Sequence, residues 1–192
     1  IVAATIAPGS DLVLENVGIN PTRDAMLQIM QLMGADIELE NKREQSGEPV
    51  ADIHIKSSDL KGIDIPEELV PVAIDEFPVI MVAASCARGE TRLSGAAELR
   101  VKESDRIQSM LDGFIAIGVH AEDTEDGMII QGGEYNGGEV NSHGDHRIAM
   151  AFAVAGLVSK APIRINDCEN VATSFPGFVE LAQTAGMNIA YD

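Results

Sequence analysis

Residues 77–123 read FPVIMVAASCARGETRLSGAAELRVKESDRIQSMLDGFIAIGVHAED. The stretch begins with an apolar, alanine-rich run that predicts a buried helix. It continues through a short strand and a polar turn, and then places apolar residues at helical spacing up to Gly118. Another strand follows the glycine. This order predicts a helix, strand, helix, strand unit in which Gly118 ends the second helix.

Two further segments, residues 1–39 and 147–191, repeat this order, with Gly34 and Gly186 in the place of Gly118. Alternating segments between the copies are typical of additional strands joined by glycine turns. These segments are ADIHIKSS, KGIDIPEELV and GMIIQGGEYNGGEVNS. Each full unit therefore reads βαβαββ.

The three units predict an α/β (α+β) fold in which residues 1–192 form a single lobe. A unit of about 60 residues is too small to bury a core by itself, so we expect one core shared by all three. Apolar stripes on two amphipathic helices should belong to it. They consist of Met26, Ile29, Met30 and Met33, and of Ile107, Met110, Leu111, Phe114 and Ile117. The first unit begins in mid-helix at Ile1, which predicts an incomplete repeat and a chain that is part of a longer one.

The charge balance narrows the possible partners. The chain has 13 Lys and Arg against 31 Asp and Glu, a formal net charge of −18. This charge disfavours binding to nucleic acid or anionic membranes, although a few arginines in a cleft can still attract a small anion. The longest apolar run is too short to cross a bilayer. Cys86 and Cys168 lie in apolar stretches and are interpreted as two buried, reduced thiols in preference to a disulfide, which suits a cytoplasmic protein.

The turn LRVKESDRIQSM, residues 99–110, carries an unusual density of charge before an apolar helical pattern. Ser104 is a candidate N-cap of that helix. Lys102 and Arg106 would join the free amides of the helix start in attracting an anion, and the planar guanidinium suits phosphate or carboxylate. A solvated helix start with local ion pairs involving Glu103 explains the same pattern without a ligand.

A second charged cluster is the segment SHGDHRIAMAF, in which Asp145, His146 and Arg147 precede an almost entirely apolar helix. A helix of this composition is buried, so partners or a ligand should hold its charged start. A purely structural capping role for Asp145 remains open. In the second unit, Asp75 occupies the place equivalent to that of Asp145.

Four segments, in this order and spacing, resemble the carboxy-terminal half of the enolpyruvylshikimate phosphate synthase family. They are IDEFPV (74–79), LRVKESDRI (99–107), DHRIAMAF (145–152) and ATSFPGF (172–178). The resemblance covers nearly the whole chain. It implies one lobe of a two-lobed inside-out α/β barrel, each lobe built from three βαβαββ repeats. Glu98 and Thr173 depart from the pattern, because many members have Asn and Lys there.

The resemblance also implies an activity. Members of the family transfer the enolpyruvyl group of phosphoenolpyruvate to the 5-hydroxyl of shikimate 3-phosphate and release phosphate by addition and elimination. The expected partners are these two small molecules and the missing N-terminal lobe, and no metal or organic cofactor is expected. Because the second lobe is needed to close the site, the chain alone is expected to be inactive.

Carried over by motif, Asp75 and Glu103 are the candidates for proton transfer. Asp75 and Lys102 would contact shikimate 3-phosphate. Lys102, Arg106 and Arg147 would hold phosphoenolpyruvate, and Lys102 is an alternative base if neighbouring cations lower its pKa.

All five residues should lie on one face at helix starts, with Arg106 and Arg147 facing bulk water. Asp145 and His146 are expected to support them.

Two rival interpretations come from other classes of protein. A sister enolpyruvyl transferase that acts on a nucleotide sugar shares the fold, but RVKESDR followed by DHR is closer to the shikimate branch. A noncatalytic binding module agrees with the repeats alone. It leaves the combination of Asp75, Lys102, Glu103, Arg106 and Arg147 unexplained.

Overall fold

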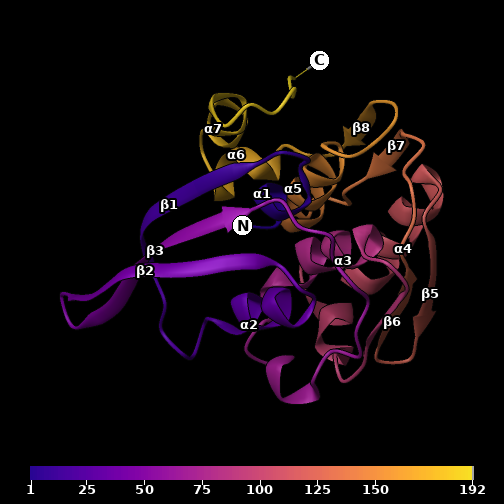
Figure 1. Ribbon diagram of the computed structural model, residues 1–192. Helices are drawn as coiled ribbons and strands as arrows, with labels where there is room; N and C mark the ends of the chain where they lie inside the picture. The colour runs from indigo at the N-terminus through magenta and orange to yellow at the C-terminus, as the bar shows by residue number, and fades with distance from the viewer. Residues whose placement is uncertain (192) are drawn as a thin grey trace.

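The first repeat contains a three-stranded antiparallel sheet in the computed structural model, which describes residues 1–191 (Figure 1). Its elements are α1 (Val2–Ile6), β1 (Asp11–Gly18), α2 (Ala25–Leu32), β2 (Asp36–Gln45) and β3 (Glu48–Lys56). The strand order is β1-β3-β2. Along β3, Ile53 and Ile55 are buried while His54 between them is turned to the other, more exposed face. This alternation is what the two-residue period of a strand requires.

The second repeat is the most complete. Its elements are η1 (Glu67–Leu69), η2 (Ile74–Glu76), α3 (Phe77–Cys86), β4 (Glu90–Leu93), η3 (Ala97–Val101), α4 (Arg106–Ile117), β5 (His120–Thr124) and β6 (Gly127–Gln131). The sheet has the order β4-β6-β5 with antiparallel pairs. Parallel bridges join Lys61 to Arg88 and Asp64 to Arg92 beside β4. The segment KGIDIPEELV, expected to be a strand, therefore forms only isolated bridges before η1.

The third repeat has a parallel pair of strands. Its elements are β7 (Gly138–Asn141), α5 (His146–Ala155), β8 (Ile163–Asn166), α6 (Asn170–Ser174) and α7 (Phe178–Thr184). The predicted strand after Gly186 is wrong, because residues 187–191 have no regular secondary structure. In the other two repeats the corresponding strands, β2 and β5, each pair with the next strand along the chain. Residues 187–191 pair with no neighbouring strand, so their backbone N–H and C=O groups lack the inter-strand hydrogen bonds that define a strand.

The predicted helix-ending glycines are confirmed. Gly34, Gly118 and Gly186 have φ of +93°, +85° and +95°. Each lies just past an amphipathic helix, where a left-handed conformation satisfies the last carbonyls and glycine has no side chain to clash. The same local chemistry thus ends the corresponding helix of all three repeats.

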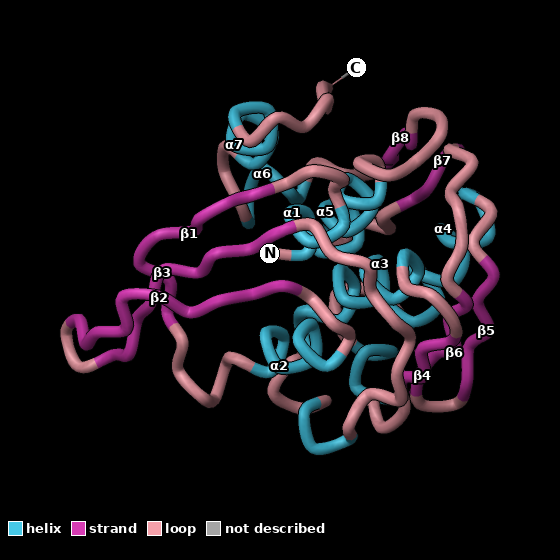
Figure 2. Tube along the Cα trace, viewed as in Figure 1, coloured by secondary structure: helices cyan, strands magenta, loops and turns pink. Residues whose placement is uncertain are grey.

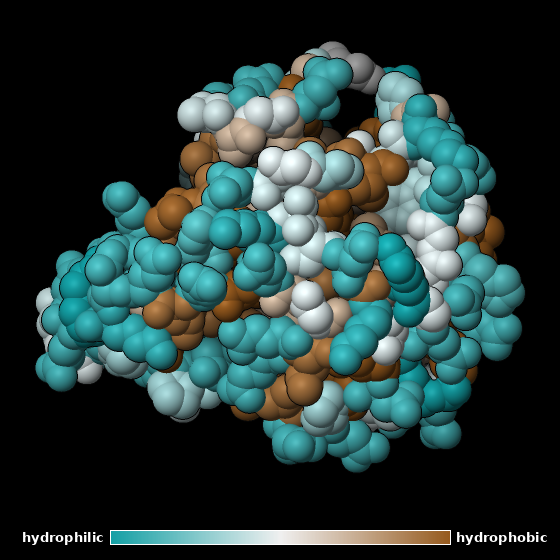
Figure 3. All heavy atoms as spheres, in the orientation of Figure 1, coloured by the Kyte–Doolittle hydropathy of each residue, from teal (hydrophilic) through white to brown (hydrophobic). Residues whose placement is uncertain are grey.

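The first helices of the three repeats pack against one another at the centre of the molecule. Figure 2 shows α1, α3 and α5 in the middle, with β1–β3 on one side and β4–β6 on the other. Almost every side chain of α3 is buried, as its apolar composition predicts. The predicted stripes join the same core, with Met26 and Leu111 only partly buried. Hydrophilic side chains cover the β2–β3 hairpin (Figure 3).

No helix within residues 1–191 combines the length and the apolar character that crossing a membrane would require.

Candidate active site

Arg106 is at the centre of a cluster of charged side chains. Although it is the first residue of α4, its side chain is only 1% exposed. Its Nε donates to Asp145 Oδ2 at 2.8 Å, its Nη1 donates to Asp75 Oδ1 at 3.1 Å, and its Nη2 donates to Glu103. Three carboxylates from three separate segments therefore surround one buried guanidinium. The expectation that Arg106 faces bulk water is wrong, because these carboxylates hold its side chain inward.

Two further cations converge on Asp75. Lys102 Nζ lies 3.5 Å from Asp75 Oδ1 and donates to Glu98, one helical turn before it. Arg147 Nη1 donates to the backbone carbonyl of Asp75 at 2.8 Å, and its Nη2 lies 3.9 Å from Asp75 Oδ2. Asp75, Lys102, Glu103, Arg106 and Arg147 are thus brought together from positions up to 72 residues apart.

Two helix starts supply this geometry. Asp145 caps α5 by accepting from Arg147 N at 2.9 Å through Oδ1, while its Oδ2 accepts from Arg106. The structural capping role left open for Asp145 is therefore real, and it coexists with an ion pair. His146 follows at the first position of α5, half-buried, and takes part in none of the ion pairs described for residues 1–191.

The N-cap of α4 is not Ser104, as the sequence suggested, but Asp105. Asp105 Oδ1 accepts from Gln108 N at 3.0 Å. Ser104 Oγ instead donates to Asp145 Oδ2 at 3.2 Å, which links the turn to α5. The aspartate is the stronger acceptor because its carboxylate is charged, and the amide donors at a helix start favour negative charge.

The electrostatics of the cluster favour the ionised form of its two aspartates, Asp75 and Asp145. Desolvation acts to raise the pKa of Asp75, but the charges of Arg147 and Lys102 and the hydrogen bond from Arg106 lower it overall. Asp145 behaves in the same way, since burial opposes ionisation while Arg106 lowers its pKa below the usual range.

For Lys102, the hydrogen bond to Glu98 raises the pKa, with a further contribution from Asp75. The expectation that neighbouring cations lower this pKa is therefore wrong. The ammonium group contacts two carboxylates, those of Glu98 and Asp75, and both favour its charged form. At neutral pH Lys102 is a cation and a proton donor.

The sequence predicts no role for two residues of this region, Glu98 and Arg100. Glu98 was noticed only as a departure from the family pattern, yet its spacing of four from Lys102 on a helical turn is a recognisable pairing signal. Arg100 was seen only as one more charge in the turn. Asp105, one of its partners, is five residues away, but no local pattern identifies the others, because Asp123 and Thr124 at the end of β5 and Glu125 just after it lie 23 to 25 residues away.

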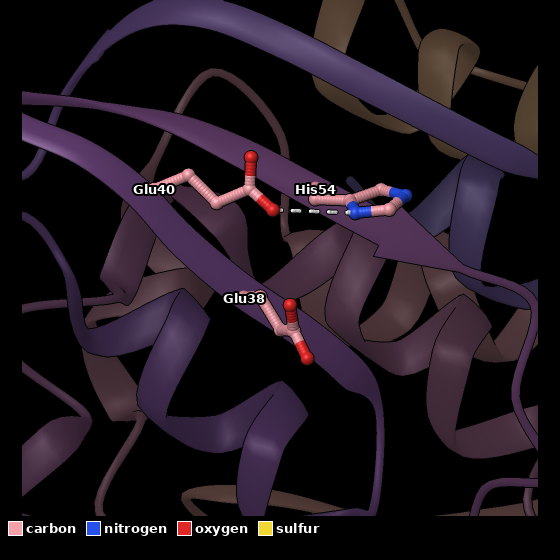
Figure 4. Close-up of side chains that lie close together, drawn as sticks. All are labelled: Glu38, Glu40 and His54. Atoms are coloured by element: carbon pink, nitrogen blue, oxygen red, sulfur yellow. Dashed lines mark ion pairs between the residues drawn. The ribbon is translucent and has the colours of Figure 1, made fainter.

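A separate group of titratable side chains stands on the first sheet. Figure 4 shows Glu38 and Glu40 on β2 beside His54 on β3, with ligand atoms within 4.8 Å of one another. The His54 Nδ1 lies 3.6 Å from Glu40, and its Nε2 lies 2.6 Å from Asp11 Oδ1. Such atoms can bind a divalent cation. However, Glu38 and Glu40 are exposed, and the imidazole of His54 is already hydrogen-bonded to Asp11. We therefore interpret the group as an ordinary cluster of surface ion pairs.

The family model described as EPSP synthase (3-phosphoshikimate 1-carboxyvinyltransferase) matches residues 1–181. The chain belongs to the EPSP synthase family. A 3-phosphoshikimate 1-carboxyvinyltransferase of Nitrosococcus oceani is 62% identical over 191 residues, covering 100% of the chain and 43% of that protein. One of Legionella pneumophila is 62% identical over 182 residues, covering 95% and 42%. The chain therefore spans less than half the length of these EPSP synthase relatives.

Solved structures agree with this membership. EPSP synthase from Acinetobacter baumannii superposes with a TM-score of 0.94 at 57% identity, covering 97% of this chain and 44% of that one. The enolpyruvyl transferase NikO from Streptomyces tendae has a TM-score of 0.74 at 14% identity, covering 100% and 42%, and shows the fold alone. The predicted resemblance and fold class are confirmed: this member of the EPSP synthase family has the α/β fold of one lobe of the inside-out barrel.

Proposed function

We propose that the full-length protein transfers the enolpyruvyl group of phosphoenolpyruvate to the 5-hydroxyl of shikimate 3-phosphate with release of phosphate. The names of the relatives support this activity. The single observation that carries it is the convergence of Asp75, Lys102, Glu103, Arg106 and Arg147 around one point. Both reactants are anions, and a cluster of cations with interleaved carboxylates provides the charge and the proton carriers that the reaction needs.

The addition step requires the 5-hydroxyl to lose a proton while the alkene carbon of phosphoenolpyruvate gains one. In the elimination step, a proton leaves that carbon and phosphate departs. Asp75 and Glu103 are the proposed proton carriers. The lowered pKa of Asp75 makes it an ionised acceptor, and the raised pKa of Lys102 makes it a donor to oxygen and a contact for both substrates.

Arg106 and Arg147 are the proposed phosphoenolpyruvate ligands. A guanidinium carries about five N–H donors, and the three ion pairs of Arg106 use three of them. The remaining N–H groups are donors for a ligand. Arg147 is about one-third exposed and makes one direct hydrogen bond to Asp75. Glu98 is the most exposed carboxylate of the cluster, at 61%, so its side chain can turn toward water when an anionic substrate binds, while Glu103 stays beside Arg106 as a proton carrier.

We infer that residues 1–192 form one lobe and that an N-terminal lobe completes the site. One connected core supports the first inference, because it includes buried residues from all three repeats, such as Ile29, Ile80 and Ile148. The shared length supports the second, since the relatives are more than twice as long as the matched region. We also propose a cytoplasmic location, in keeping with the free thiols of Cys86 and Cys168.

The test is a phosphate-release assay on the full-length protein with phosphoenolpyruvate and shikimate 3-phosphate, with a nucleotide sugar as the alternative acceptor. The expected result is turnover with the shikimate acceptor only, and its loss by at least about 100-fold in Asp75→Ala and Glu103→Ala. Turnover with the nucleotide sugar, or none with either acceptor, would contradict the proposal. Arg88→Lys is a matched control, because Arg88 is 79% exposed and pairs only with Asp59 among the described ion pairs.

A further inference from the structure

The guanidinium of Arg100 is engaged through all three of its nitrogen atoms. Nη1 donates to Asp105 Oδ2 at 3.1 Å, and Nε donates to the backbone carbonyl of Glu125 at 3.1 Å. Nη2 donates to the Thr124 carbonyl at 2.6 Å and to Asp123 Oδ2 at 3.1 Å. The catalytic and binding roles proposed above leave this network without a function.

These contacts join the two ends of the turn that carries Lys102 and Glu103. Arg100 lies in η3, before the turn, and Asp105 is the N-cap of α4, after it. The hydrogen bond between Arg100 and Asp105 therefore closes residues 101–104 into a short loop. The contacts to Thr124 and Glu125 attach the base of this loop to the turn between β5 and β6.

Apolar packing does not hold the loop itself. Leu99 and Ile107 are fully buried on either side of it, but Val101 within it is 80% exposed. Polar contacts hold individual side chains of the loop: Ser104 donates to Asp145 at 3.2 Å and accepts from Ser109 at 3.3 Å, Lys102 contacts Glu98 and Asp75, and Glu103 pairs with Arg106. Arg100 adds the contacts that join the two ends of the loop to each other and to the end of β5.

We propose that Arg100 is a positioning residue that fixes Lys102 and Glu103 by clamping the loop 101–104 to the β5–β6 turn. This inference deepens the proposed function and rests on it. A planar guanidinium with about five donors can reach two carboxylates and two carbonyls at once, whereas an ammonium is a point charge on a flexible stem. Lysine at this position would keep the charge and lose most of the contacts.

The experiment compares the full-length protein with Arg100→Lys, Asp105→Asn and the double variant, with Arg88→Lys as control. Asparagine is as good an N-cap as aspartate, so Asp105→Asn keeps the start of α4 and weakens only the clamp. A displacement of about 1 Å can cost about 100-fold in rate, so Arg100→Lys should lower kcat by about 10- to 100-fold. The double variant should be no slower than the worse single variant, because both changes break the same contact.

Stability and rate separate positioning from a merely structural role. If Arg100 positions the loop, kcat per folded protein falls more than KM rises while Tm stays within about 2 °C of the parent. A kcat within about threefold of Arg88→Lys would overturn the proposal, as would multiplicative effects in the double variant or a loss of kcat that follows the loss of folded protein.

A second measurement distinguishes this inference from the proposed function. If the unmodified full-length protein shows no turnover, the proposed function fails. Hydrogen exchange at the amides of residues 101–104 then tests the clamp directly. Faster exchange there in Arg100→Lys, but not in Arg88→Lys, supports the clamp, and unchanged exchange overturns it.

Discussion

Replacing Asp145 by alanine would test how strongly the buried ion pair holds the site together. Asp145 is fully buried, and its partner Arg106 is 1% exposed, so the substitution leaves a buried guanidinium nitrogen without its acceptor. Breaking a buried pair from one side costs about 3–5 kcal/mol. The lost cap of α5 adds about 0.5–2 kcal/mol, although the two losses share one carboxylate and will not simply add.

Urea unfolding followed by circular dichroism measures the loss. Asp145→Ala should lower the free energy of unfolding by about 3–5 kcal/mol. Asp145→Asn keeps a capping oxygen but loses the charge opposite Arg106, so we expect about 1.5–3 kcal/mol. Asp59→Ala is the matched control, because Asp59 is 82% exposed and pairs with the exposed Arg88; an exposed pair contributes about 0–1 kcal/mol. Equal losses in Asp145→Ala and Asp59→Ala would refute the reasoning.

The pH dependence provides a second check on the same pair. Arg106 lowers the pKa of Asp145 in the folded chain below its ordinary value of 3.8. Ionisation therefore stabilises the fold fully above pH 3.8 and stops doing so as the pH falls through the lowered folded-state pKa. The stability gap between the parent and Asp145→Asn should be widest near neutral pH and shrink in strong acid. A gap that grows on acidification would contradict the assigned direction.

Three further outcomes are expected. Gly113→Ala should destabilise the chain by about 1–3 kcal/mol in urea unfolding, because a methyl group there would lie 2.1 Å from the Phe152 ring; an unchanged midpoint would mean that the α4–α5 contact is looser than described. Glu98→Gln should lower the pKa of Lys102 in an NMR titration, since the hydrogen bond that Lys102 donates to Glu98 is the largest cause of the raised pKa. An unaltered titration would exclude that cause. The 192-residue chain alone should release no phosphate from phosphoenolpyruvate and shikimate 3-phosphate and bind them no tighter than about millimolar in calorimetry, because it lacks the proposed N-terminal lobe that would close the site; micromolar binding would disprove this.

The sequence predicted the repeats because their signals are local. Glycines past the amphipathic helices, alternation along β3 and an apolar run through α3 each follow from backbone geometry within one element. The family motifs also identified residues that gather in one cluster.

Predictions from local sequence patterns were wrong where the structure depends on a contact with a distant part of the chain. Residues 187–191 have a strand-like composition and form no strand, because a strand depends on a neighbour. Ser104 and Asp105 are both good capping residues by type, and only the folded contacts assign the cap to Asp105 and turn Ser104 toward Asp145.

The electrostatic state of the site depends largely on tertiary structure. Arg106 is buried because carboxylates up to 39 residues away in sequence approach it, whereas the pKa of Lys102 is raised first by Glu98, four residues before it, and further by the distant Asp75. Charge interactions depend on distance in space and on exclusion of water, and neither quantity is encoded in the spacing of a motif. The sequence by itself determined which charged residues are candidates for the site, while the packing of α3, α4 and α5 decided which of them meet.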